Sequence, residues 1–127
     1  MKNNVYKILT TEEWVQASKD GQIKTDLDKE DGFIHLSFAS QLNSTLSRFF
    51  DESDNAILLQ LNLAALDIQK LVFEESFIDA CKRKVIFPHL YSTLTLCQVS
   101  KNWILKGEAF CLPEEVMLEV KNIQESS

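Results

Sequence analysis

The stretch DGFIHLSFASQ, residues 31–41, indicates how this chain folds. Its Asp-Gly pair is a turn signal, and the residues after it alternate in polarity as the residues of a strand do. Phe33, His35 and Ser37 share one face of this predicted strand. The other face is wholly apolar, with Ile34, Leu36 and Phe38. A strand of this kind covers a core with one face and lines a cleft with the other.

A helix is expected directly after this strand, with Ser40 as its N-cap. Apolar residues follow at positions 42, 46, 49 and 50, which is the period of an amphipathic helix packed on a sheet. Arg48 lies on the other face of that helix, where a solvated side chain is the simplest interpretation.

The residues before this stretch predict one strand and one helix. VYKIL, residues 5–9, is rich in strand-forming residues, and Thr10 and Glu13 then have the spacing of a capping box. The helix that they begin is expected to end at Gly21. Residues 22–31, QIKTDLDKED, have no apolar period and are interpreted as a surface loop.

The residues after it are mostly predicted strands. AILLQLNL, residues 56–63, is a central strand by its apolar density, with a short helical turn at 63–66, and LVFE, residues 71–74, is a further strand. FPHLYS leads into TLTLCQVS and NWILKGEAFCL, which together predict two or three antiparallel strands. A short helix ends the chain around residues 116–123. This order predicts an α+β fold, in which two N-terminal helices pack on a mixed or mostly antiparallel sheet.

Composition limits the function classes. With 127 residues the chain is the size of one domain, and its formal net charge of -6 argues against a broad nucleic-acid or membrane-binding surface. Three widely spaced cysteines, with no signal peptide and no membrane-spanning run, indicate a cytoplasmic protein with reduced thiols. The three glycines leave no room for a Rossmann or P-loop nucleotide motif.

Four polar residues stand on apolar strands, where the local pattern does not require them: His35, Glu74, His89 and Tyr91. His89 and Tyr91 share a strand face, and Pro88 before them is typical of an edge or a bulge. If these side chains converge in one cleft, they form a site of two imidazoles, a phenol and a carboxylate. Such a site can bind a polar ligand, relay a proton or stabilise a developing cation. The sequence has no metal-ligand motif, and no metal is expected.

Each of these residues also has a structural interpretation. A single strand histidine is often a satisfied, partly buried residue, and Glu74 alone is a strand-end carboxylate that faces water. Tyr91 alone is an amphipathic core residue with its hydroxyl at the surface.

Five segments in order resemble the DUF952 family of small bacterial proteins of unknown function: VYKILTTEEW, DGFIHLSFASQ…TLSRFF, AILLQLNLAAL, LVFEES and FPHLYSTLTLCQV. The resemblance covers residues 5–113 and leaves 114–127 as a helical extension of a single domain. The family is grouped by fold with the ADP-ribosyltransferases, so the resemblance implies a split β-sheet whose cleft binds NAD.

The resemblance also implies roles for individual residues. Glu74 would orient the attacked ribose as a catalytic residue, with His35 and His89 beside it. The expected ligand-binding residues are Lys7, Ser37, Arg48 and Tyr91.

The sequence departs from the family pattern at several positions. Lys7 stands where the family often has histidine, Phe73 replaces a tryptophan, and Ser92 replaces a glycine. The segment from Cys81 to Lys84 is an insert whose basic residues are most simply interpreted as solvated; its place beside the predicted cleft gives the alternative that Lys82 to Lys84 meet phosphate.

The leading hypothesis is therefore a cytoplasmic protein that binds NAD or a related nucleotide and transfers ADP-ribose through an oxocarbenium-like state. A non-catalytic ligand-binding module on the same fold is the second hypothesis, and Lys7 favours it. A small hydrolase or isomerase that uses both histidines as acid and base is the third.

Overall fold

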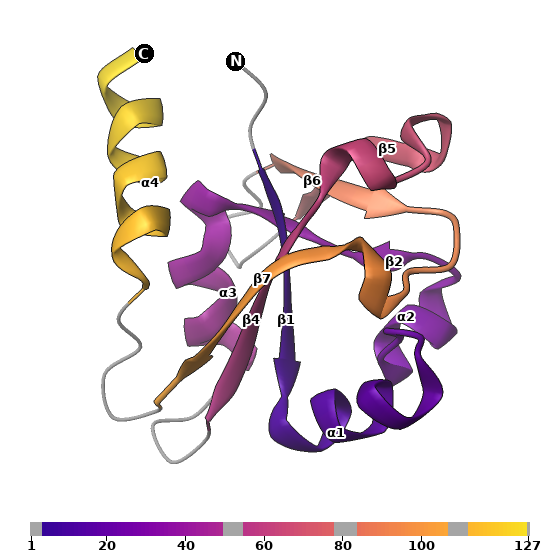
Figure 1. Ribbon diagram of the computed structural model, residues 1–127. Helices are drawn as coiled ribbons and strands as arrows, with labels where there is room; N and C mark the ends of the chain where they lie inside the picture. The colour runs from indigo at the N-terminus through magenta and orange to yellow at the C-terminus, as the bar shows by residue number, and fades with distance from the viewer. Residues whose placement is uncertain (1–3, 50–54, 78–83, 107–111, 127) are drawn as a thin grey trace.

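Two antiparallel β-sheets form the centre of the computed structural model, which describes residues 4–49, 55–77, 84–106 and 112–126 (Figure 1). The larger sheet has the strand order β3-β1-β4-β7, from Ser37–Phe38, Val5–Thr10, Ala56–Leu61 and Val99–Leu105. The smaller sheet has the order β2-β6-β5, from Ile34–His35, Lys84–Leu90 and Leu71–Phe77. Every strand pairing within the described ranges is antiparallel, so the predicted α+β class with antiparallel sheets is confirmed.

In the described residues, four α-helices and four short 3-10 turns accompany the sheets. The helices are α1 Thr11–Asp20, α2 Asp26–Asp31, α3 Leu42–Phe49 and α4 Glu114–Ser126. The turns are η1 Ala39–Gln41, η2 Leu63–Ala65, η3 Ile68–Lys70 and η4 Leu96–Gln98. Within the part of the chain just described, no helix combines the length and apolarity needed to cross a bilayer.

The larger sheet separates two hydrophobic clusters. Strand alternation sends Val5 and Leu9 of β1 to one face, where they pack with residues of α1 and of the smaller sheet. Tyr6 points to the other face, where residues of α3 and α4 cover it. Figure 1 shows this arrangement, with α3 and α4 on one side of the larger sheet and the smaller sheet, α1 and α2 on the other.

Helix α4 is fixed to the larger sheet by polar contacts as well as by packing. The Tyr6 hydroxyl donates to Glu119 Oε1 at 2.5 Å, and the Asn4 side chain donates to the same oxygen at 3.0 Å. Burial and the bond to Glu119 raise the pKa of Tyr6 to about 12. The terminal helix predicted from the sequence is confirmed.

The signals at the start and end of α1 are also confirmed. Glu13 N donates to Thr10 Oγ1 at 3.1 Å, and Thr10 N donates to the Glu13 carboxylate at 2.8 Å. Gly21 ends the helix with a φ of 76°, a left-handed conformation that favours glycine.

Three element predictions were wrong. The expected loop at 22–31 contains α2, because Thr25 and Asp28 form a second capping box. Ser40 does not cap a helix, since η1 begins one residue earlier and the Gln41 side chain accepts from Phe38 N at 2.9 Å. TLTLCQVS is not a strand up to Gln98, because Thr95 N donates to the Gln98 side chain at 2.9 Å and closes η4.

The stretch that predicted the fold crosses between the two sheets. Ile34 and His35 pair with β6 of the smaller sheet, whereas Ser37 and Phe38 pair with β1 of the larger one. Leu36 lies at the crossing, with 3% of its surface exposed, and its N–H donates to Pro88 O at 3.1 Å. One predicted strand is therefore two short strands that join the sheets.

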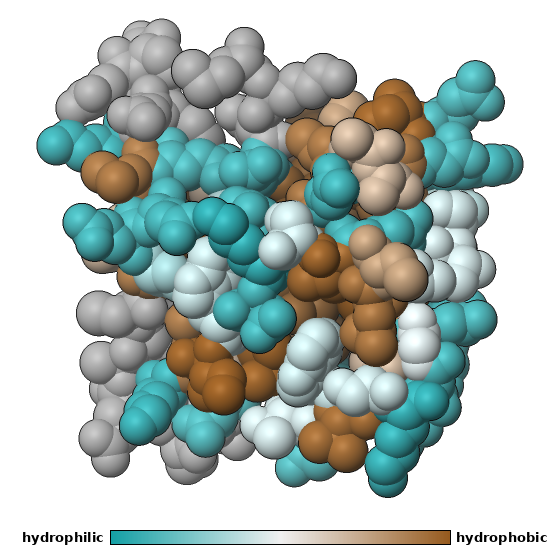
Figure 2. All heavy atoms as spheres, viewed as in Figure 1, coloured by the Kyte–Doolittle hydropathy of each residue, from teal (hydrophilic) through white to brown (hydrophobic). Residues whose placement is uncertain are grey.

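Exposed apolar side chains are most frequent on the side of the smaller sheet. Figure 2 shows apolar groups gathering on this side of the molecule, with polar side chains between them. Val72, Phe73 and Ile86 of β5 and β6, and Tyr91 just beyond, are at least 38% exposed. Strand alternation puts Val72 and Tyr91 on the same face as His89, whereas Phe73 and Ile86 lie on the opposite face. The face that carries His89 is the open face on which a ligand can approach.

Candidate active site on the smaller sheet

The pairing of the smaller sheet brings the two histidines together. His35 of β2 lies directly opposite His89 of β6, and their ring centroids are 5.7 Å apart. That distance is within reach of one common ligand, so one site can contain both residues.

Glu74 of β5 is held by two donors from the β6 strand and its end. Its Oε1 accepts from the Tyr91 hydroxyl at 2.5 Å and lies 2.8 Å from His89 Nδ1. The bond from Tyr91, and then that from His89, lower the pKa of Glu74 below its ordinary value. The same bond to Glu74 raises the pKa of Tyr91. At neutral pH the site therefore presents an ionised carboxylate beside a protonated phenol.

Phe33 forms the apolar centre of this group. Its ring stacks on His89 with centroids 4.1 Å apart, and it lies 4.5 Å from the ring of His35 and 5.2 Å from that of Tyr91. We call Phe33, His35, Glu74, His89 and Tyr91 the imidazole cluster. The structure thus brings together all three predicted catalytic residues and the predicted ligand-binding Tyr91.

Helix α2 supplies two carboxylates to His35 that the sequence interpretation missed. His35 Nδ1 lies 2.6 Å from Asp28 Oδ1, and Nε2 lies 2.8 Å from Asp31 Oδ2. The side chain of Asp28 is fully buried, whereas that of Asp31 is 42% exposed. Thr25-x-x-Asp28 was the signal that could have located Asp28, since a capping box fixes a carboxylate at the start of a helix.

Lys7 lies between the two sheets, in contact with both Asp28 and His35. Its Nζ is 2.9 Å from Asp28 Oδ2, donates to His35 O at 3.0 Å and is 4% exposed. Burial lowers the pKa of Lys7, and the attraction of Asp28 opposes that change. Burial of Asp28 favours its neutral form, but the bonds from His35 and Lys7 outweigh burial and hold the pKa of Asp28 well below its usual range. Ligand binding by Lys7 stays a prediction, and its observed contacts position Asp28 and His35.

Of the other predicted residues, Ser37 does not join the cluster. Ser37 belongs to the larger sheet, where its hydroxyl lies 3.4 Å from that of Thr45, because the chain changes sheets at Leu36. Arg48 lies in α3, and its side chain is outside the described residues. The insert from Cys81 to Arg83 is also outside the described residues, while Lys84 begins β6.

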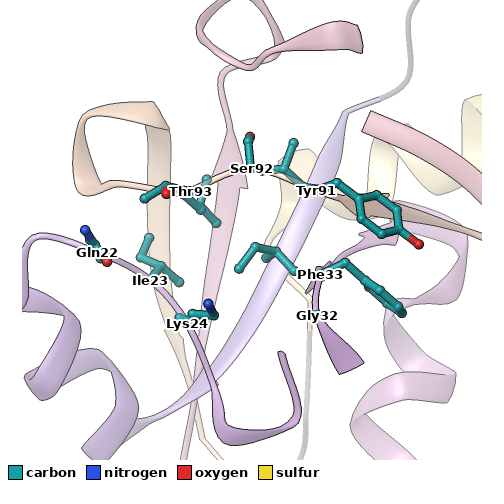
Figure 3. Close-up of a pocket in the computed structure, with 11 residues that line it drawn as sticks. Gln22, Ile23, Lys24, Gly32, Phe33, Tyr91, Ser92 and Thr93 are labelled. Carbon is teal, nitrogen blue, oxygen red and sulfur yellow. The ribbon is translucent and has the colours of Figure 1, made fainter. Parts of the chain in front are cut away.

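A pocket of about 240 Å³ adjoins the imidazole cluster. Three segments of the chain line it: residues 22–24, 32–34 and 90–94. Figure 3 shows the rings of Phe33 and Tyr91 side by side at one end of the pocket and Gln22, Ile23 and Lys24 at the other. Phe33 and Tyr91 belong to both the pocket and the cluster, so one ligand can occupy both.

The chemistry of the site is that of hydrogen bonding and charge. Among the described residues, no three His, Cys, Asp or Glu side chains are placed to hold a metal ion. The groups that are present can bind a ring against Phe33, accept hydroxyl protons at Glu74 and stabilise a positive charge beside it.

Comparison with known proteins identifies relatives of this chain. The family model described as "Protein of unknown function (DUF952)" matches residues 8–102. The crystal structure of protein CC0527 from Caulobacter crescentus is similar, with 31% identity, a TM-score of 0.71 and coverage of 91% of this chain and 97% of that one. The solution structure of CC0527 has 32% identity and a TM-score of 0.66 over 81% of this chain and 84% of that one. No match was found among curated proteins.

Proposed function

The chain belongs to the DUF952 family, and on this premise we propose that it binds NAD or a related nucleotide over the imidazole cluster and transfers ADP-ribose from it. The proposal includes an ADP-ribosyltransferase-like form of the split sheet. Its partner is a small nucleotide ligand.

The Glu74 carboxylate carries the proposal. It is ionised, its side chain is 39% exposed, and Tyr91 and His89 fix its orientation through one oxygen. An orientated carboxylate on a sheet face is suited to accept a hydrogen bond from a ribose hydroxyl and to stabilise an oxocarbenium-like transition state. Phe33 offers the apolar surface on which an aromatic ring of the ligand packs.

The pocket supports a ligand that extends beyond the cluster. At about 240 Å³ it is smaller than the 300–1,000 Å³ of common ligand pockets, so it has room for part of a dinucleotide, with the rest lying over the open sheet face. Lys24 on the pocket wall is a cation suited to a phosphate group.

Each residue has a defined part in the proposed reaction. Phe33 and the pocket bind the leaving base, Glu74 accepts from the ribose, and His89 and Tyr91 keep Glu74 in place. Cleavage of the glycosidic bond moves its electrons to the base and leaves positive charge on the ribose, which Glu74 stabilises until the acceptor attacks.

The experiment is a titration with NAD that follows both the melting temperature and the release of nicotinamide. At NAD concentrations about 100 times Kd, binding adds about 2.7 kcal/mol to the free energy of unfolding. We expect Glu74→Gln to keep most of this stabilisation and to lose nicotinamide release, whereas Glu75→Gln, at the next position, keeps both. Neither stabilisation nor release in the wild-type protein would refute the proposal.

A non-catalytic binding module is the second candidate, and the contacts of His35 favour it. Both ring nitrogens of His35 lie against carboxylates of the protein itself, so the ring is held as a hydrogen-bonding group for a ligand and not as a general base. Stabilisation by NAD without nicotinamide release would support this candidate over the transferase.

A further inference from the structure

The two carboxylates that contact His35 differ in how freely they can move. Asp28 is fully buried, and it also bonds to Lys7 and to the backbone N–H of His35. Asp31 is the last residue of α2 and is 42% exposed. The Nδ1 side of the imidazole is therefore fixed, while the Nε2 side can open by rotation of one surface side chain.

The geometry also defines what His35 offers at Nε2. A neutral imidazole carries one N–H, so His35 can donate to both carboxylates only as the imidazolium. The other ionisable groups near it are Lys7 behind Asp28, and His89 with its partner Glu74 across the sheet. An imidazolium whose Nδ1 is bound to a buried carboxylate presents a directed, charge-assisted donor at Nε2.

We propose that Asp31 takes the position at His35 Nε2 that an oxyanion of the ligand occupies on binding, and that Asp31 must move away for the ligand to enter. The group recognised is a phosphoryl or carboxylate oxygen. The inference rests on the proposed function for its nucleotide, in which the diphosphate supplies the oxyanion. Gly32, the residue after Asp31, lines the pocket, so the exchange takes place at the pocket edge.

Asp31→Asn tests this exchange, with inorganic pyrophosphate as the probe and calorimetry as the measurement. The substitution removes the competing charge and keeps the shape, and we expect pyrophosphate to bind about threefold to tenfold tighter than to the wild type. Asp26→Asn is the matched control, because Asp26 is an exposed residue of the same helix and changes the net charge equally. Equal affinities in these two variants, both for pyrophosphate and for the second probe, succinate, would overturn the inference.

A double variant tests whether the tighter binding of pyrophosphate depends on His35. In His35→Gln/Asp31→Asn the tighter binding should disappear, since the charged donor at Nε2 is gone, and thermal melting checks that each variant folds. Pyrophosphate should also perturb the ring nitrogen resonances of His35 in ¹⁵N-labelled Asp31→Asn protein. A gain that persists without His35, or unperturbed ring resonances, would also overturn the inference.

Succinate, used as a second probe, distinguishes a carboxylate source from a phosphate source, and tightening of either probe by Asp31→Asn supports the exchange. Because neither probe contains a nucleotide, the result is independent of the NAD experiment. Failure of NAD to bind would refute the proposed function and leave the oxyanion site standing.

Discussion

At the scale of single residues, the Asp28 carboxylate connects helix α2 to strands β1 and β2, although it was not among the predicted site residues. Its Oδ1 accepts from Lys7 Nζ and from the backbone N–H of His35, and its Oδ2 accepts from Thr25 N at 2.9 Å. Polarity on an apolar strand was enough to predict His35, Glu74, His89 and Tyr91. Asp28 lies in a run with other acidic residues, where its capping-box spacing from Thr25 sets it apart, but that spacing does not predict its burial against Lys7 and His35.

Lys7→Met should be strongly destabilising. It leaves the Asp28 carboxylate buried without its cation, which costs about 3–5 kcal/mol of unfolding free energy. Urea unfolding measures the loss. The exposed Lys29→Met of α2 is the control and should change the free energy by less than about 0.5 kcal/mol. A loss of that smaller size for Lys7→Met would contradict the role given to the ion pair.

Acid should destabilise the protein partly through Asp28. Because its pKa is lower in the folded state, Asp28 stabilises the fold above the ordinary carboxyl value, about 4. That stabilisation is lost as the pH falls from there towards the folded-state pKa. Asp28→Asn should be less stable than the wild type at pH 7 and should lose less between pH 5 and 3, as urea midpoints at each pH will show. Parallel losses in both proteins would count against this explanation.

At the scale of elements, a helix was predicted correctly where the sequence carried clear start, stop or apolar-period signals for it. Helix α1 has both a capping box and a glycine stop, and α4 has an apolar period, so both were predicted. Helix α2 has six residues and no apolar period, so its polar sequence was interpreted as a loop. The local evidence for it was the capping box of Thr25 and Asp28 at its start and Gly32 at its end.

The two glycines that end α1 and α2 allow a matched test of whether the end of α2 contributes to NAD binding. Gly21 and Gly32 have φ values of 76° and 82°, and no atom lies within 4 Å of an added Cβ at either. Alanine at each position should therefore cost about 1 kcal/mol through backbone strain alone. Only Gly32→Ala should also weaken NAD binding, because Gly32 connects Asp31 to Phe33. Urea unfolding and the NAD-induced melting shift measure the two effects, and equal shifts in both variants would contradict the prediction.

At the scale of the whole molecule, the sequence predicted strands and not their partners. His35 and His89 are far apart along the chain, and their pairing depends on a change of sheet at Leu36 that alternation does not reveal. For the same reason Ser37 was assigned to the site, although it pairs in the other sheet. The family resemblance predicted the division of the sheet, because it includes long-range information that a local pattern lacks.

Leu36→Ala should destabilise both sheets together. The side chain is 3% exposed and belongs to the cluster that both sheets share, so its truncation should cost about 2–5 kcal/mol. Urea unfolding followed by fluorescence and by circular dichroism should give one coincident transition at a lower midpoint. Leu118→Ala of α4, where the side chain is 52% exposed, is the control and should have little effect. Two separate transitions in the variant would show that the sheets unfold independently.

The contacts of Glu119 bring the beginning and the end of the chain to one place. Asn4 N donates to Glu119 Oε2 at 3.2 Å, and Figure 1 shows the start of β1 on the same side of the molecule as the end of α4. A peptide linker can therefore join them, and the exposed turn at Ala64 and Ala65 offers a place to open the chain anew. Such a circular permutant would keep every strand neighbour while placing Glu74 and His89 ahead of His35 in the chain. The site should survive this change of order, since its geometry belongs to the sheet.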